Sequence, residues 1–279
     1  MSSSAAGTLF LVSTPIGNLG DISHRAVETL SSAALIVAED TRHSRRLLDH
    51  YGITTPVRAY HEHNEAKETP RLVARLCAGD SVALISDAGT PLISDPGSRL
   101  VAAAVEAKVS VVPIPGASSV LAALVASGMP LERFTFFGFL PRKGKKRGEA
   151  IAEIVASPVT VVIFEAANRV AATLKALSNS GAAERRAVVA RELTKKFEEF
   201  ARGTVAELAS TYDASAPRGE VVLVISGADS VEMSETELRS AAKKHRAAGA
   251  SSREVMDHLI SALGAPRNLA YRLAQEVDS

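Results

Sequence analysis

The chain has 279 residues, a length that suits about two domains. Hydrophobic residues make up 46% of it, which allows a sizeable core and excludes an intrinsically disordered chain. Aromatic residues make up 4% with no tryptophan, so stacked aromatic platforms for single-stranded nucleic acid are not expected. The formal net charge of +1 neither indicates nor excludes an RNA partner, and any basic surface must be local.

Cysteine content and apolar runs indicate a cytoplasmic protein. Cys77 is the single cysteine, so no disulfide or cysteine-based metal site can form within one chain, and its apolar-patterned segment predicts a buried side chain. The opening residues, MSSSAAG, lack the basic region and apolar core of a signal peptide. No apolar run approaches the roughly 20 residues that span a bilayer, so we expect no membrane partner.

Strand and helix patterns alternate along the first half of the chain. Short apolar runs predict strands, and the segments between them have helical spacing. This alternation predicts an α/β fold with a parallel or mostly parallel sheet. The expected strands are 8–14, 33–38, 57–60, 82–85 and 109–114, and the expected helices include 21–30, 65–78, 98–108 and 120–126.

Three of these strands end in loops of small residues. Ligands of open parallel sheets bind beyond the carboxyl ends of the strands, where small residues let the backbone come close. Ordinary connecting loops are the alternative, but three of them at one edge favour a binding cleft. Neither GxGxxG nor the P-loop pattern occurs, which excludes a standard dinucleotide site and a Walker NTPase. The loops are 14–20, 86–91 and 115–119.

Charged residues follow the strand at 33–38, in the sequence Glu39-Asp40-Thr41-Arg42-His43. Acids, a base and an imidazole at a strand end are the residue types of which catalytic sites are made. Arg42, Arg45 and Arg46 continue along the next helix, where a solvated basic face is an equal alternative to a ligand-facing role. His61-Glu62-His63 indicates hydrogen bonding at a cleft edge more than metal binding, since alternation in a strand splits the side chains and no third ligand follows nearby.

The second half repeats the α/β pattern. After a boundary at Gly128-Met129-Pro130, strands are expected at 134–141, 159–164, 187–190 and 220–225, with helices at 169–177 and 204–212. A basic run, RKGKKR, lies between the first two of these strands. Its density in a near-neutral chain favours phosphate contacts over a merely solvated loop. Its basic residues are Arg142, Lys143, Lys145, Lys146 and Arg147.

The last segment has helical patterns only, at 237–248, 253–263 and 266–276. The last two helices are similar to a helix-turn-helix, and their candidates for phosphate contacts are Arg253, Arg267, Asn268 and Arg272. Packing or dimer bracing is an almost equal alternative, because seven basic residues balance seven acidic ones over 231–279. We expect domains at 1–127, 128–228 and 236–279, with a polar linker, ADSVEMSE, at 228–235.

Several strand-end segments have distinctive sequences. The most specific are AEDTRH at 38–43 and SDAGTPLISDPG at 86–97, in that order and spacing. STPIGNLGDIS, HEHNE, PIPGASS, GFLPRKG, FEAANR and ARELTKKFEE accompany them. With these segments the chain resembles the ribosomal RNA small subunit methyltransferase I family, a branch of the tetrapyrrole methylase superfamily, over residues 8–227. The tail is similar to that family's small C-terminal helical domain.

The resemblance implies two α/β domains of tetrapyrrole-methylase type with an S-adenosyl-L-methionine cleft between them, plus the helical domain. It implies 2′-O-methylation of a cytidine ribose in the decoding region of 16S rRNA, in an assembled or assembling 30S subunit. A homodimer is implied, and no metal. Ser13, Ala117 and the residues after Glu165 depart from the family's usual pattern, which puts single contacts in question. The implied cofactor-binding residues are Pro15, Asp87, Ala88, Gly89, Ser118, Ser119, Phe164 and Glu165.

The chemistry of this transfer suggests a catalytic set. Transfer from a sulfonium needs the oxygen nucleophile in line with the methyl group, and a proton acceptor helps a weakly nucleophilic hydroxyl. We hypothesise that Glu39, Asp40, Arg42 and Lys195 surround the ribose. Asp40 would accept the proton, while Arg42 and Lys195 would hold phosphate or developing charge. The alternatives are a superfamily relative that acts on a small molecule or a protein, and a non-enzymatic RNA-binding assembly protein.

Overall fold

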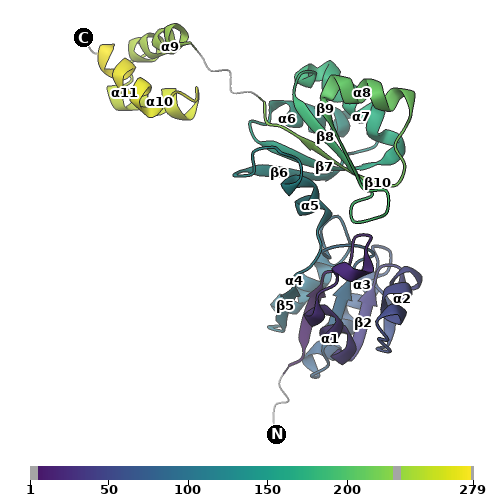
Figure 1. Ribbon diagram of the computed structural model, residues 1–279. Helices are drawn as coiled ribbons and strands as arrows, with labels where there is room; N and C mark the ends of the chain where they lie inside the picture. Colours follow the sequence, from purple (N-terminus) through teal and green to yellow (C-terminus); the bar gives the residue numbers. More distant parts are fainter. Residues whose placement is uncertain (1–5, 229–233, 278–279) are drawn as a thin grey trace. The chain divides into compact units, whose positions relative to one another are not determined.

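The computed structural model describes residues 6–228 and 234–277, and the chain divides into two compact units, Met1–Ser226 and Gly227–Ser279 (Figure 1). The larger unit contains two five-stranded sheets with their helices, and the smaller unit contains helices. The expected fold class, two α/β domains and a helical region, is confirmed. Within the described ranges no helix is long and apolar enough to cross a membrane.

The first sheet is entirely parallel, as the alternation of strands and helices predicts. Its strand order is β3-β2-β4-β1-β5, and every neighbouring pair is parallel. β1 therefore lies between β4 and β5, and its carboxyl end is adjacent to theirs. The strands are β1 (Thr8–Val12), β2 (Leu35–Ala38), β3 (Val57–Ala59), β4 (Val82–Ile85) and β5 (Ser110–Ile114).

Helices cover both faces of this sheet, because its central strands have apolar side chains on both faces. Val82 and Leu84 of β4 join the core formed with α3 and α4, whereas Ala83 and Ile85 join the core formed with α1 and α2. All four side chains are buried. The helices are α1 (His24–Ser32), α2 (Thr41–His50), α3 (Glu65–Cys77) and α4 (Ser98–Glu106), with the short η1 (Leu19–Asp21) before α1.

The second sheet is mixed. Its order is β6-β7-β10-β8-β9, in which β6 and β7 are parallel and the other three pairs are antiparallel. β9 and α6 were not predicted, because β9 is a half-buried edge strand with weak alternation and α6 begins inside the basic run. The strands are β6 (Phe134–Phe139), β7 (Thr160–Ala166), β8 (Arg186–Arg191), β9 (Glu199–Thr204) and β10 (Glu220–Ile225).

The two faces of the second sheet are covered differently. One face packs on α6 (Lys145–Ala156), α7 (Val170–Leu177) and α8 (Val205–Ala214). The short elements η2 (Ala167–Arg169) and η3 (Ser178–Ala182) flank α7. The other face packs on α5 (Ser119–Val125), whose Val120, Ala123 and Leu124 share a core with Val222 and Val224 of β10. Although α5 directly follows the last strand of the first sheet, it is therefore part of the core of the second.

The smaller unit is built from α9 (Glu235–Ala247), α10 (Ser252–Ser261) and α11 (Arg267–Glu276), around an apolar core that includes Leu238, Leu259 and Leu273. Arg272, a candidate phosphate ligand, forms an ion pair with Glu235 at 2.6 Å. The other three candidates are exposed: Arg253, Arg267 and Asn268. Most of the expected linker, residues 229–233, lies outside the described residues.

The prediction that Cys77 is buried is wrong, because its side chain is exposed at the end of α3. Leu72 and Leu76 of the same helix point into the core, and a residue directly after Leu76 is turned about 100° away around a helix of 3.6 residues per turn. The apolar run in the sequence was correctly assigned to a helix, but Cys77 lies outside its buried face.

These neighbours provide a matched test of the core. We expect Leu76→Ala to lower the free energy of unfolding by about 2–5 kcal/mol, because Leu76 is 0% exposed and its removal leaves a cavity. Cys77→Ala should change it by about 0.5 kcal/mol or less. Denaturant unfolding of both variants measures the difference, and equal losses would contradict the assigned packing of α3.

Candidate functional site

Hydrogen bonds join the loops after β1, β4 and β5 into one wall. Thr14 and Gly89 exchange both backbone hydrogen bonds, at 2.8 and 3.0 Å, and the Thr14 hydroxyl donates to the Ser86 carbonyl at 3.3 Å. The Thr90 hydroxyl donates to the Ala117 carbonyl at 3.4 Å. Gly89 has a φ of +77°, which glycine adopts without the steric cost that a side chain would add. The expected meeting of three small-residue loops is confirmed.

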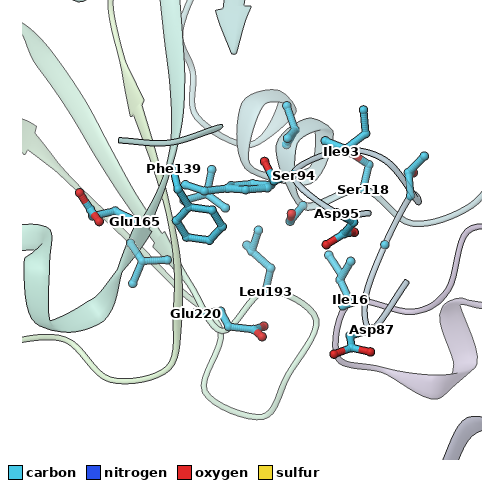
Figure 2. A pocket seen from close by; sticks show the side chains of 18 of the residues that line it. Ile16, Asp87, Ile93, Ser94, Asp95, Ser118, Phe139, Glu165, Leu193 and Glu220 are labelled. Atoms are coloured by element: carbon cyan, nitrogen blue, oxygen red, sulfur yellow. The ribbon is translucent and has the colours of Figure 1, made fainter. Parts of the chain in front are cut away.

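A cavity of about 430 Å³, the first cavity, opens beside this wall (Figure 2). Its volume falls within the range of about 300–1,000 Å³ that holds small molecules in proteins. Loops of the first sheet form one side of it, and β7, β10 and the segments next to them form the other. Residues 87–90, 93–95, 118–120, 164–166 and 219–222 line it, together with Ile16, Phe139 and Leu193.

The first cavity has acidic side chains on an otherwise uncharged lining. Asp87, Asp95, Glu165 and Glu220 line it, whereas its described lining residues include no lysine, arginine or histidine. Figure 2 shows Asp87, Asp95 and Glu220 around the opening. Such a distribution of charge favours a ligand that is positively charged.

The Glu165 carboxylate is turned away from this cavity (Figure 2). It is fully buried, accepts a hydrogen bond from the Thr173 hydroxyl at 2.6 Å and forms an ion pair with Arg169 at 3.2 Å. It also accepts from the Ala166 N–H at 2.9 Å. Glu165 therefore borders the cavity from the side opposite its carboxylate, and that carboxylate stabilises the end of β7.

Arg147, the last residue of the basic run, belongs to the same network. Its guanidinium donates to the Thr173 hydroxyl at 2.9 Å and to the Pro141 carbonyl at 3.2 Å. Arg169 donates to the Leu140 carbonyl at 2.9 Å, so two arginines hold the chain just after β6. Arg147 is thus engaged within the fold. The other four basic residues of the run are exposed: Arg142, Lys143, Lys145 and Lys146.

Two carboxyl groups beside the first cavity are poorly placed for ionisation. Burial raises the pKa of Asp95 to about 6, a hydrogen bond from Ser86 opposes the shift, and the charges of Glu39 and Asp87 add to it. Burial also raises the pKa of Glu39, and the charge of Asp87 adds to the effect. Groups whose pKa is shifted by burial together with neighbouring charges concentrate at functional sites.

A second cavity, of about 250 Å³, adjoins the first. The loop after β1 and helix α2 form most of its wall, and three basic side chains, His43, Arg46 and Lys195, line it. These basic side chains distinguish it from the first cavity. The lining residues are 14–17, 43–44, 46–47 and 85–88, with Leu19, Lys195 and Glu220.

Lys195 is held between two carboxylates at this second cavity. Its Nζ lies 3.0 Å from Oε1 of Glu192 and 2.9 Å from Oε2 of Glu220. Burial would lower the pKa of Lys195, but hydrogen bonds to Glu220 and Glu192 raise it above its usual value. A Cβ on Gly17 would lie 2.5 Å from the Lys195 side chain, so the close approach of the two loops requires glycine there.

The sequence-predicted catalytic residues do not gather at one point. Lys195 lines the second cavity, whereas Glu39, Asp40 and Arg42 line neither cavity. Asp40 caps α2, and hydrogen bonds from the backbone N–H groups of Arg42 and His43, at 2.8 and 3.3 Å, hold its pKa below the usual range. The Arg42 side chain is 92% exposed.

The predicted cofactor-binding residues are brought together more closely. Pro15 lines the second cavity, and the other seven line the first. His61-Glu62-His63 lies in a turn after β3 instead of the expected strand. No group of three or more potential ligands is placed to hold a metal ion among the residues that the structure describes.

Two loops at the cavities contain strained residues. Leu92 and Ser94 have φ values of +72° and +67° in the loop after β4, and Glu192 and Thr194 have +51° and +65° before β9. Left-handed conformations of this kind cost about 1–3 kcal/mol each and cluster at functional sites. Both loops border a cavity, since Ser94 lines the first and Lys195 the second.

Comparisons with known proteins identify the family of the chain. The family model for tetrapyrrole (corrin/porphyrin) methylases covers residues 8–209. The chain belongs to the tetrapyrrole methylase family. It is 45% identical over 276 residues to ribosomal RNA small subunit methyltransferase I of Synechocystis, covering 98% of this chain and 99% of that one. The protein of the same name from Mesorhizobium japonicum is 51% identical over 222 residues, covering 79% and 76%. The resemblance stated from the sequence is confirmed.

A solved structure supports the methylase fold. Uroporphyrin-III C-methyltransferase from Thermus thermophilus, complexed with S-adenosylhomocysteine, has a TM-score of 0.57 and 18% identity, covering 79% of this chain and 97% of that one.

Sequence reasoning missed several residues of the candidate site, above all Glu220. Strand carboxyl ends were searched for functional residues, but β10 is antiparallel to β7, with Glu220 opposite Ala166. The amino end of β10 therefore lies at the same edge as the carboxyl end of β7. Knowledge that β10 pairs with β7 identifies Glu220 as a site residue, whereas no local sequence pattern does.

The raised pKa of Asp95 has a consequence for stability. Its usual pKa is 3.8, so as the pH rises from about 4 to about 6 the unfolded chain ionises first and the folded state loses stability. Asp95→Asn should therefore raise the thermal unfolding midpoint more at about pH 8 than at about pH 4. Exposed Asp21→Asn is the control. A gain for Asp95→Asn that is the same at both pH values would contradict the assigned burial.

Proposed function

We propose that the chain transfers the methyl group of S-adenosyl-L-methionine to the 2′-hydroxyl of a cytidine in the decoding region of 16S rRNA. The names of its close relatives support the RNA substrate and the methyltransferase activity. The single observation of the structure that supports the proposal most is the pairing of an acidic cavity with an adjoining basic one.

The acidic first cavity suits this cofactor. S-adenosyl-L-methionine supplies an activated methyl group on a sulfonium and has an ammonium group as well, so it carries positive charge where Asp87 and Asp95 can attract it. The small residues Ala88, Gly89, Ser118 and Ser119 let backbone approach the cofactor.

The aromatic wall of the same cavity adds apolar contact. The rings of Phe139 and Phe164 lie 5.5 Å apart and both line the cavity. Phe139 is 58% exposed, an unusual position for a phenylalanine, and bound cofactor would cover it. We include Phe164 and the backbone of Glu165 in the cofactor site.

The exposed part of the basic run is the proposed RNA contact. Lys145 and Lys146 begin α6, where the helix dipole disfavours positive charge and no acidic residue lies in the first turn, although Lys145 pairs with Glu149 one turn later at 3.6 Å. Bound phosphate would relieve this repulsion. Arg142 and Lys143 extend the same charge before the helix.

The setting of the reaction is part of the proposal. We place it in the cytoplasm, on an assembled or assembling 30S subunit, and we expect a homodimer. Leu121 and Val125 of α5, which are 52% and 68% exposed, are apolar residues that an interface would cover.

A methyl-transfer assay tests the proposed function. Purified protein with methyl-labelled S-adenosyl-L-methionine should label assembled small subunits or naked 16S rRNA, and digestion should release 2′-O-methylcytidine. Label in a tetrapyrrole extract alone would favour a small-molecule relative. No label, together with no heat of binding for S-adenosyl-L-methionine in calorimetry, would favour an RNA-binding assembly protein.

Salt dependence tests the basic run. Replacing Arg142, Lys143, Lys145 and Lys146 with glutamine should weaken rRNA binding and make log K less sensitive to log salt, by about 0.7–0.9 in slope for every phosphate that is no longer neutralised. Cofactor affinity should not change. Lys67→Gln and Lys108→Gln, two exposed lysines of the first domain, are the control. An unchanged slope in the fourfold variant would remove this loop from the RNA interface.

A further inference from the structure

The two cavities share one boundary. Four residues line both of them: Ile16, Asp87, Ala88 and Glu220. Two of the four, Asp87 and Glu220, have carboxylates. A group transferred between ligands in the two cavities would pass this boundary, so its proton acceptor is best placed there.

The second cavity differs from the first in the ligand that it favours. Arg46 and Lys195 provide the cations that attract phosphate, and the first cavity has no lysine or arginine among its described lining residues. Its volume of about 250 Å³ lies below the range for drug-sized ligands, which suits a single sugar or nucleoside. A cationic methyl donor would thus occupy the acidic first cavity, and an anionic acceptor would occupy the adjoining basic one.

We propose that the second cavity holds the acceptor nucleotide, with its phosphate near Arg46 and Lys195, and that Glu220 is the catalytic base for the ribose hydroxyl. This inference rests on the proposed function. It replaces Asp40, which lines neither cavity and whose Oδ1 caps α2.

Glu220 suits the role better than Asp87, the other carboxylate at the boundary. Oδ1 of Asp87 accepts the backbone N–H of Asp40 at 3.1 Å, so this oxygen is committed to holding the loop after β4 against α2. The Glu220 side chain is 73% exposed, and its Oε2 pairs with Lys195. The exposure of this side chain leaves room for a substrate hydroxyl to reach the other oxygen, Oε1.

The backbone of Glu220 is held firmly while its carboxylate remains accessible. Its N–H donates to Oε1 of Glu192 at 3.1 Å, and its carbonyl accepts the Glu192 N–H at 3.0 Å. As the first residue of β10 it also pairs with Ala166 of β7. The sheet thus fixes the backbone from which the Glu220 side chain extends, and the ion pair with Lys195 directs the carboxylate.

The step balances without a further reagent. The 2′-oxygen forms a bond to the methyl carbon as the carbon–sulfur bond breaks, and the sulfonium keeps that electron pair as a neutral thioether. The hydroxyl proton goes to the Glu220 carboxylate. Lys195, shared between Glu220 and Glu192, is a positioning residue that orients the base and holds the phosphate.

Kinetics of Glu220→Gln test the assignment. The glutamine keeps the size of the side chain and an oxygen for Lys195, but accepts no proton. We expect kcat to fall by about 100-fold or more, with little change in KM for either substrate. The ascending acid limb of log kcat against pH should disappear. Other titratable or charged groups lie around Glu220. Lys195 pairs with both Glu220 and Glu192, and Asp87, His43 and Arg46 line the same cavity.

Two variants separate this role from neighbouring ones. Glu192→Gln changes the other carboxylate on Lys195 and should keep the acid limb. Arg46→Met should raise KM for RNA more than it lowers kcat. Calorimetry with S-adenosyl-L-methionine checks that Glu220→Gln still folds and binds the cofactor.

Three results would overturn the proposal. They are a kcat for Glu220→Gln within about threefold of the unmodified protein, an acid limb that persists in it, and a loss confined to cofactor affinity. If the unmodified protein itself fails to methylate rRNA, the proposed function fails instead, and the two failures are distinguishable.

Discussion

The pair of backbone hydrogen bonds between Thr14 and Gly89 is the constraint on which both cavities depend. It fixes the loop after β1 to the loop after β4, and residues of these loops, Ile16, Asp87 and Ala88, line both cavities. The same pair determines where Ile16 enters the core beside the second sheet. Because backbone makes the bond, most side chains of the wall are free to serve the ligand, while Gly89 must tolerate a left-handed conformation.

Sequence patterns predicted most of the fold because apolar periodicity is local. Every strand of the first sheet was located within two residues of its observed ends, and the small-residue loops indicated the correct edge. Side-chain direction was beyond such reasoning. Glu165 follows an apolar run and was expected at the ligand, yet its carboxylate turns to Thr173, eight residues later. Arg147 was grouped with its basic neighbours, although tertiary contacts engage it within the fold.

A carboxyl group with a raised pKa and strained backbone occur in the same loop, the one after β4. The fold tolerates a carboxyl group with a pKa of about 6 at Asp95, and it tolerates left-handed conformations at Leu92 and Ser94 in the same segment. Each lowers the stability of the free protein, and a cationic ligand would stabilise ionised Asp95. The same trade-off between stability and function is visible at Glu192 and Thr194, next to Lys195.

The packing of α5 links the folding of the two sheets. During synthesis the first sheet has all of its strands once Ile114 has been made, but the surface that α5 covers is complete only when β10, with Val222 and Val224, has been made. Until then part of the apolar face of α5 remains exposed to water or to other chains. A fragment that ends after α5 would expose this apolar face permanently, which would favour its aggregation. We therefore expect Met1–Ser226 to fold as one cooperative unit.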